Sequence, residues 1–179
     1  AVYFTGITLS IYNHKNINLF YKFLCSLKKK GIVICFDFNV RLKNWKDKKI
    51  ARKQILRFLK ISNIIFLTQE DLDDLGIKKY KKFIFDNFNN KLAIIRSSNG
   101  NISVYNEQNF SNFNFTFKKK VKDTTGCGDA FNACFLYYYY NNFKIKDCIQ
   151  IAHKLGKDVA NVNGAIIKKE NFKLENYGP

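Results

Sequence analysis

Short apolar runs alternate with segments of helical periodicity along this chain, and that alternation most restricts the folds it can adopt. The runs at residues 32–36 and 64–67 are typical of strands buried on both faces. Apolar residues recur at helical spacing over residues 17–30, where Gly31 ends the pattern, and again over residues 47–59. Strands and helices that alternate with short links predict an α/β fold with a largely parallel sheet, covered by helices on both faces.

The other segments continue this pattern. Further strands are expected at residues 2–4, 92–95, 102–105 and, as an exposed or edge strand, 114–117. Further helices are expected at residues 69–75, 78–88, 128–140 and 145–161. Ligands of parallel sheets bind beyond the carboxyl ends of the strands, so the residues that follow each strand are the first candidates for a site.

The net charge of +17 could indicate a nucleic-acid-binding surface. However, Lys, Asn, Ile, Phe and Tyr are abundant while Pro occurs once and Met never, which is the pattern of an AT-rich coding sequence. The lysines are also scattered, in clusters at residues 28–30, 78–82 and 118–122. We therefore favour compositional drift as the origin of the charge and expect no nucleic-acid partner.

The five cysteines are odd in number, form no C-x-x-C pair and accompany only two histidines. This argues against a disulfide framework or a Cys/His zinc site and fits a reducing, cytoplasmic location. The longest apolar stretch, residues 133–140, is about 8 residues long, against about 20 for a membrane span, so no membrane partner is expected. The chain opens at Ala1 directly into a strand-like segment, which suggests a fragment of a longer protein.

Residues 123–129, Asp-Thr-Thr-Gly-Cys-Gly-Asp, lead into an apolar helix. Gly126 and Gly128 permit tight backbone geometry and close approach of a ligand. The first N–H groups of a helix lack internal partners and favour negative charge, which makes a phosphate cradle. Asp129 could accept a proton from an attacking hydroxyl there, or could simply stabilise the helix dipole.

Residues 123–131 resemble the C-terminal signature D-T-x-G-A-G-D-A-F of the ribokinase-like (PfkB) carbohydrate kinases, with Cys127 in place of the usual Ala. The resemblance implies a three-layer αβα ribokinase-like fold with a mostly parallel sheet. It also implies ATP and Mg²⁺ as cofactors. Gly126, Cys127 and Gly128 would form the anion hole, and Asp129 would be the catalytic base.

Two other segments are similar to 2-keto-3-deoxygluconate kinases. Asp37, Asn39 and Arg41, followed by Trp45, resemble the D-x-N-x-R…W segment of those enzymes and of some fructokinases. Residues 5–10, Thr-Gly-Ile-Thr-Leu-Ser, are similar to their S-G-I-T-L-A segment. The resemblance implies substrate binding by Asp37, Asn39 and Arg41. A guanidinium such as that of Arg41 suits an acid group or phosphate, although a solvated loop arginine is the alternative.

The implied substrate is 2-keto-3-deoxygluconate, phosphorylated to its 6-phosphate. A fructokinase-like enzyme and an inactive, decayed kinase are the alternatives.

Three further segments match the family less fully. Residues 68–71 resemble an acidic N-x-x-E region, which implies that Glu70 and Asp71 help to place Mg²⁺; acidic residues are also common at helix N-termini for dipole reasons. Residues 94–100 resemble V-K-x-G-x-x-G beside the nucleotide, with Ser97 in place of the first Gly and Gly100 retained. His153, ahead of the Asn-Gly-Ala-Ile run at 163–166, stands where the family usually has Asn, and a partly exposed helix residue is the alternative to a nucleotide contact.

The resemblance covers residues 1–179 as a single partial domain, the C-terminal nucleotide-binding and catalytic part of a family member. The family's N-terminal portion and β lid are expected to be missing from this chain. We therefore expect the chain alone to phosphorylate sugar inefficiently, and the full-length protein to bind a sugar acid and ATP as a homo-oligomer.

Overall fold

The structure is a computed structural model that describes residues 1–88, 91–116, 121–168, 172 and 177–178. The chain divides into two compact units, Ala1–Thr116 and Phe117–Pro179. The single domain expected over residues 1–179 stays a prediction. Among the described residues, no helix is long and apolar enough to cross a membrane.

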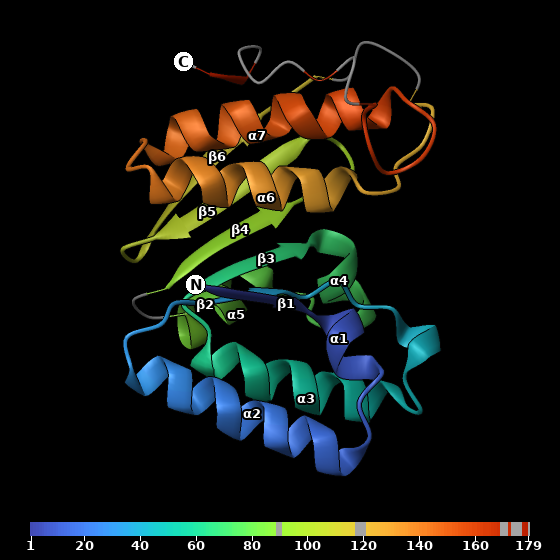
Figure 1. Cartoon of the computed structure of the whole chain (residues 1–179), viewed down its shortest axis with the longest axis vertical. Helices are drawn as coiled ribbons and strands as arrows, with labels where there is room; N and C mark the ends of the chain where they lie inside the picture. The colour runs from blue at the N-terminus through green and yellow to red at the C-terminus, as the bar shows by residue number, and fades with distance from the viewer. Residues whose placement is uncertain (89–90, 117–120, 169–171, 173–176, 179) are drawn as a thin grey trace. The chain divides into compact units, whose positions relative to one another are not determined.

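The first unit is built on a six-stranded sheet with the strands in sequence order (Figure 1). Its strands are β1 (Val2–Thr5), β2 (Ile34–Asp37), β3 (Ile64–Thr68), β4 (Leu92–Arg96), β5 (Asn101–Asn106) and β6 (Asn109–Asn114). The first four are parallel, and β5 and β6 complete the sheet in antiparallel orientation. This confirms the predicted α/β class with a mostly parallel sheet.

The register aligns the carboxyl ends of the parallel strands at one edge of the sheet. Thr5 lies opposite Asp37 in the β1–β2 pair, and Thr68 lies opposite Arg96 in the β3–β4 pair. The loops that leave these ends carry most of the predicted site residues of this unit.

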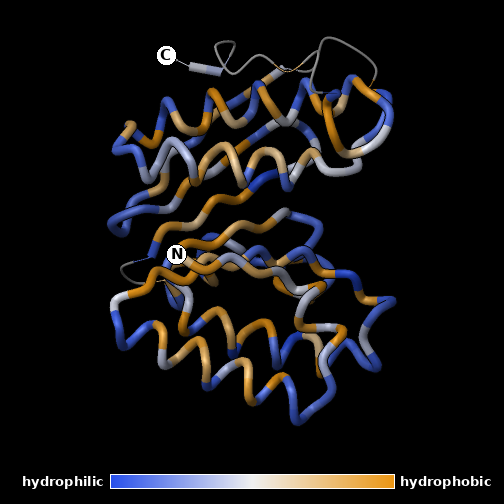
Figure 2. The backbone as a smooth tube through the Cα atoms, viewed as in Figure 1, coloured by the Kyte–Doolittle hydropathy of each residue, from blue (hydrophilic) through white to orange (hydrophobic). Residues whose placement is uncertain are grey.

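Helices connect the parallel strands of this unit. They are α1 (Gly6–Ser10), α2 (His14–Lys29), the 3₁₀ turn η1 (Leu42–Asn44), α3 (Lys48–Ile61), α4 (Gln69–Asp74) and α5 (Tyr80–Asn87). Side chains of Asn13, Asp47 and Thr68 cap α2, α3 and α4. Leu24 and Phe58 extend from α2 and α3 into a core that also contains residues of the strands. Figure 2 shows β3 and β4 as mainly hydrophobic segments and helices α2 and α3 as alternating hydrophobic and hydrophilic ones.

The second unit contains α6 (Cys127–Tyr140) and α7 (Ile145–Ala160), which pack against each other. Phe131 and Phe135 of α6 and Cys148 and Ala152 of α7 are buried. Both helices were predicted within a residue or two of their ends.

One predicted element was misplaced. The last strand lies at Asn109–Asn114 and not at residues 114–117. It pairs with β5 through a turn at Glu107 and Gln108, whose φ angles are +49° and +65°. Such turns usually contain glycine, so this one carries no obvious sequence signal. Residues 117–120, which include part of one lysine cluster, lie outside the described residues.

Candidate active site

The N-terminus of α6 has the geometry that the sequence predicted. Gly126 is the N-cap residue with a left-handed φ of +75°, and Asp129 lies in the first helical turn with its side chain exposed. Glycine is required at the cap for two reasons. The backbone conformation disfavours other residues, and an added Cβ would lie only 2.6 Å from Cβ of Ala165.

Asp123 ties this loop to the segment that follows α7, a role that the sequence reasoning missed. Its Oδ1 accepts a hydrogen bond from the amide of Thr125 (2.8 Å), and its Oδ2 accepts one from the amide of Gly164 (3.0 Å). Hydrogen bonding lowers the pKa of the Asp123 carboxyl, with the larger effect from Thr125 and the smaller from Gly164. The Asp-x-Thr spacing is typical of an Asx-turn and could have indicated the first bond.

The amides predicted to form an anion hole are partly engaged within the loop. The amide of Cys127 donates to the carbonyl of Thr124 over 3.3 Å, and its thiol contacts the carbonyl of Asp123 (3.7 Å). The helical bond from Ala130 N to Gly126 O (2.9 Å) then begins the regular turn. To bind the Cys127 amide, an anion would have to replace the long hydrogen bond from that amide to the Thr124 carbonyl. The anion-hole role of Gly126, Cys127 and Gly128 stays a prediction.

His153 lies half-buried on α7 in the same unit. Burial lowers the pKa of its imidazole, and the positive charge of Lys157 lowers it further. This shift favours the neutral ring, which can accept or donate a hydrogen bond.

In the first unit, the two segments that are similar to those of 2-keto-3-deoxygluconate kinases pack together. Gly6 begins α1 so close to the β2–η1 loop that an added Cβ would lie 2.0 Å from the carbonyl oxygen of Phe38. The Asp37 carboxylate at the end of β2 is buried and accepts a hydrogen bond from the Tyr3 hydroxyl (3.1 Å). Asn39 follows with a φ of +32°. The structure thus joins the segment at residues 5–10 to the Asp37–Arg41 loop.

The three predicted substrate contacts differ in exposure. Asp37 is buried, Asn39 is half-buried and Arg41 is exposed. The guanidinium of Arg41 makes a long contact of 3.5 Å with the carbonyl of Val40. Its position leaves it able to meet an anionic ligand from solution.

Asp71 is held inside the fold by its neighbours. Its Oδ1 accepts from the amide of Val40 (2.6 Å), and its Oδ2 accepts from the amide and hydroxyl of Thr68 (2.9 Å each). Burial raises the pKa of the Asp71 carboxyl, and these hydrogen bonds oppose that shift. The carboxylate therefore links the β3–α4 corner to the loop after β2.

These contacts do not group Glu70 and Asp71 as ligands of a Mg²⁺ ion. Both oxygens of Asp71 already accept hydrogen bonds, while Glu70 is exposed. Within the described part of the chain, no three His, Cys, Asp or Glu side chains are grouped to hold a metal. The assignment of Glu70 and Asp71 to Mg²⁺ stays a prediction, and no catalytic step is assigned to it.

The turn between β4 and β5 contains the other two predicted nucleotide contacts. Ser97 donates its hydroxyl to Oδ1 of Asn99 (2.5 Å) and contacts the carbonyl of Asn101 (3.1 Å). The amide of Gly100 donates to the Ser97 carbonyl (3.1 Å). These bonds stabilise the turn, and the nucleotide role of Ser97 and Gly100 stays a prediction.

The chain is an α/β protein with polar and charged groups at the carboxyl ends of its parallel strands, and its helix α6 begins at a left-handed glycine with a carboxylate in the first turn. The family model for pfkB family carbohydrate kinases matches residues 3–171, and the chain belongs to that family.

Individual relatives agree with this placement. The chain is 30% identical over 176 residues to the 2-dehydro-3-deoxygluconokinase of Haemophilus influenzae, covering 94% of this chain and 55% of that protein. It is 30% identical over 154 residues to fructokinase-2 of Oryza sativa subsp. japonica, covering 78% and 44%. The chain thus spans about half the length of the curated relatives it matches.

A solved structure confirms the ribokinase-like fold. The crystal structure of 2-dehydro-3-deoxygluconokinase from Thermotoga maritima matches with a TM-score of 0.74 at 20% identity, covering 93% of this chain and 56% of that one.

Proposed function

We propose that this chain carries the catalytic carboxylate of a carbohydrate kinase that transfers the terminal phosphoryl group of ATP to a sugar hydroxyl. The observation that carries the proposal is the exposed Asp129 carboxylate in the first turn of α6, beside the left-handed Gly126 cap. Asp129 would accept the proton of the attacking hydroxyl as its oxygen bonds to phosphorus.

The N-terminus of α6 fits the phosphates of ATP. The helix dipole favours negative charge there, and the loop is held in place by Asp123 and by the close approach of Gly126 to Ala165. The loop is thus shaped before a phosphate binds, and the long bond from the Cys127 amide to the Thr124 carbonyl is the one that an anion would replace. Cys127 and Gly128 would supply amides to that charge, and Mg²⁺ would arrive with the nucleotide, as is usual for phosphates.

The substrate that we propose is 2-keto-3-deoxygluconate. Arg41 is exposed on the loop that packs against α1, where its guanidinium could pair with the acid group of such a sugar. The Haemophilus 2-dehydro-3-deoxygluconokinase also matches over 94% of the chain, against 78% for the rice fructokinase. Fructose is the second candidate because that fructokinase is equally identical over the part it matches.

A coupled assay of ADP release tests the proposal, with 2-keto-3-deoxygluconate and fructose as acceptors. We expect slow turnover with the sugar acid, because the chain spans about half the length of the curated relatives it matches, and loss of that turnover in Asp129→Asn with ATP binding retained in calorimetry. Equal turnover by Asp129→Asn would refute the role of this carboxylate. ATP binding without turnover on either sugar would favour the inactive alternative.

A further inference from the structure

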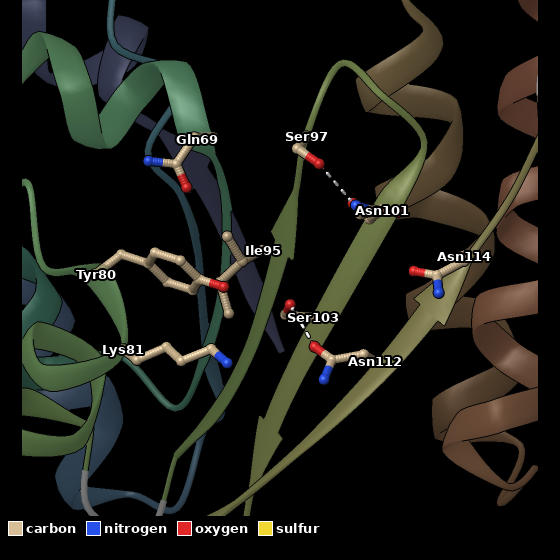
Figure 3. Close-up of a pocket in the computed structure, with 9 residues that line it drawn as sticks. All are labelled: Gln69, Tyr80, Lys81, Ile95, Ser97, Asn101, Ser103, Asn112 and Asn114. Carbon is tan, nitrogen blue, oxygen red and sulfur yellow. Dashed lines mark hydrogen bonds between the residues drawn. The ribbon is translucent and has the colours of Figure 1, made fainter.

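A groove lies between α5 and one face of the β5–β6 hairpin, entirely within the first unit (Figure 3). Its volume is about 370 Å³, within the range of about 300–1,000 Å³ that is usual for small-molecule sites. Neither Asp129 nor Arg41 lines this groove.

The hairpin gives the groove a polar wall. Its register places Ser103 opposite Asn112 and Asn101 opposite Asn114, and all four side chains line the groove. Ile102 lies between two of these residues along β5 and is buried, because alternate side chains of a strand point to opposite faces. These four positions thus present amides and hydroxyls to the groove, while Tyr105 and Phe110 lie further along the same face of the hairpin.

One hydrogen bond orients this wall. The hydroxyl of Ser103 donates to Oδ1 of Asn112 over 2.7 Å (Figure 3). That bond occupies the acceptor end of the amide and leaves the Nδ2 protons of Asn112 as donors for another group.

The facing wall brings a positive charge and an aromatic ring. Tyr80 and Lys81, from the first turn of α5, extend toward the hairpin in Figure 3. The Lys81 ammonium lies 5.9 Å from the centre of the Phe110 ring, so the charge lies on this side of the sheet. None of the described lining residues is Asp or Glu, so the charge of Lys81 has no counter-charge within the groove.

We propose that this groove binds a small polyhydroxylated anion, such as a sugar phosphate or a sugar acid, at a site whose lining includes neither Asp129 nor Arg41. Lys81 and the Asn112 amide would donate hydrogen bonds to the anionic group. The remaining amides and Tyr80 would contact hydroxyls and one face of the carbon chain, as amides and aromatic rings can do with such ligands. The proposal does not depend on the proposed kinase activity.

Calorimetric titration of the whole chain tests it, with glucose 6-phosphate, gluconate, inorganic phosphate and glucose as probes. We expect at least one of the two hydroxylated anions to bind, and to bind more tightly than phosphate or glucose. The two anions distinguish a phosphate-bearing ligand from a carboxylate-bearing one.

Matched variants connect binding to the groove. Lys81→Gln should weaken binding at least about tenfold, the effect of removing a charge-assisted hydrogen bond. Lys82→Gln removes the same charge one residue along α5, outside the lining, and should leave affinity within about twofold. Asn112→Leu tests the hairpin wall, and circular dichroism verifies that each variant is folded.

Three results would overturn the proposal. The first is that neither hydroxylated anion binds at millimolar concentration. The second is equal weakening by Lys81→Gln and Lys82→Gln, which would reveal only an effect of net charge. The third is displacement of the bound anion by ATP. Ser97, a predicted nucleotide contact, also lines the groove, so displacement would assign the groove to the nucleotide site.

Discussion

Gly126→Ala is the most informative single change at the proposed phosphate cradle. The substitution has two separate effects on the folded state. Alanine must adopt the left-handed φ of +75°, and its Cβ would lie 2.6 Å from Cβ, 2.8 Å from O and 2.9 Å from Cα of Ala165. Two of those three atoms belong to the backbone, so a side-chain rotation cannot relieve the overlap.

The two effects can be estimated separately. A left-handed conformation costs a residue other than glycine about 1–2 kcal/mol. Overpacking of a well-filled site adds about 1–3 kcal/mol. We therefore expect Gly126→Ala to lower the free energy of unfolding of the second unit by about 2–5 kcal/mol.

Gly164→Ala is the matched control. Its φ is +84°, but nothing lies within 4 Å of an added Cβ. This variant carries the conformational cost of about 1–2 kcal/mol without the overlap. The difference between the two variants therefore measures how closely the loop at Gly126 approaches Ala165.

Urea unfolding followed by circular dichroism gives the free energies, and hydrogen exchange resolved by peptide locates the effect. Protection should fall in α6 and α7, while α2 and α3 serve as an internal reference. ATP affinity, measured by calorimetry, should fall in Gly126→Ala more than in Gly164→Ala. Equal destabilisation by the two substitutions would show that the approach to Ala165 is not tight, and the reasoning would fail.

Three other predictions concern single side chains. Asp71→Asn should lower the free energy of unfolding by about 1–3 kcal/mol, because the NH₂ group of asparagine cannot accept the hydrogen bonds that one carboxylate oxygen of Asp71 accepts. The exposed Glu70→Gln should change it by under about 0.5 kcal/mol in the same urea titration, and a comparable loss there would contradict this account. The folded-state pKa of His153 is lowered, so its contribution makes stability fall as the pH drops below 6.5, and His153→Asn should flatten that slope in urea titrations across pH. Arg41→Lys should raise KM for the sugar acid about tenfold and leave KM for fructose unchanged, whereas equal effects on both sugars would argue against pairing with an acid group.

Most of the fold was predictable because its signals are local. Four consecutive apolar residues at β3 mark a strand buried on both faces, and Gly31 ends α2 within two residues of its predicted end. The missed elements lack such signals. α1 is five residues long, which is too short for hydrophobic periodicity to reveal it. It is stabilised by a hydrogen bond from the amide of Thr8 to the Thr5 hydroxyl (3.3 Å).

The candidate site was less predictable because its contacts join distant parts of the sequence. An acidic residue at a helix N-terminus indicates either a metal ligand or a dipole partner, and the sequence leaves both roles open for Asp71. It gives no sign that the shortest hydrogen bond of Asp71 comes from Val40, 31 residues earlier. Likewise, Asp37 follows a buried strand as expected, but its burial beside Tyr3 depends on the pairing of β1 with β2.

The loop at residues 123–129 is therefore shaped by contacts between two segments of the chain. Asp123 accepts a hydrogen bond from Gly164, and Gly126 leaves room only for Ala165, so the Asn-Gly-Ala-Ile segment at residues 163–166 helps to shape the loop before Asp129. Replacing Ala165 with a larger residue should consequently also disturb the N-terminus of α6, through the overlap alone and without the conformational cost at Gly126, although the two lie 39 residues apart. A carboxylate in a helix's first turn is common, and the contacts between these two segments are what would make Asp129 part of a catalytic site.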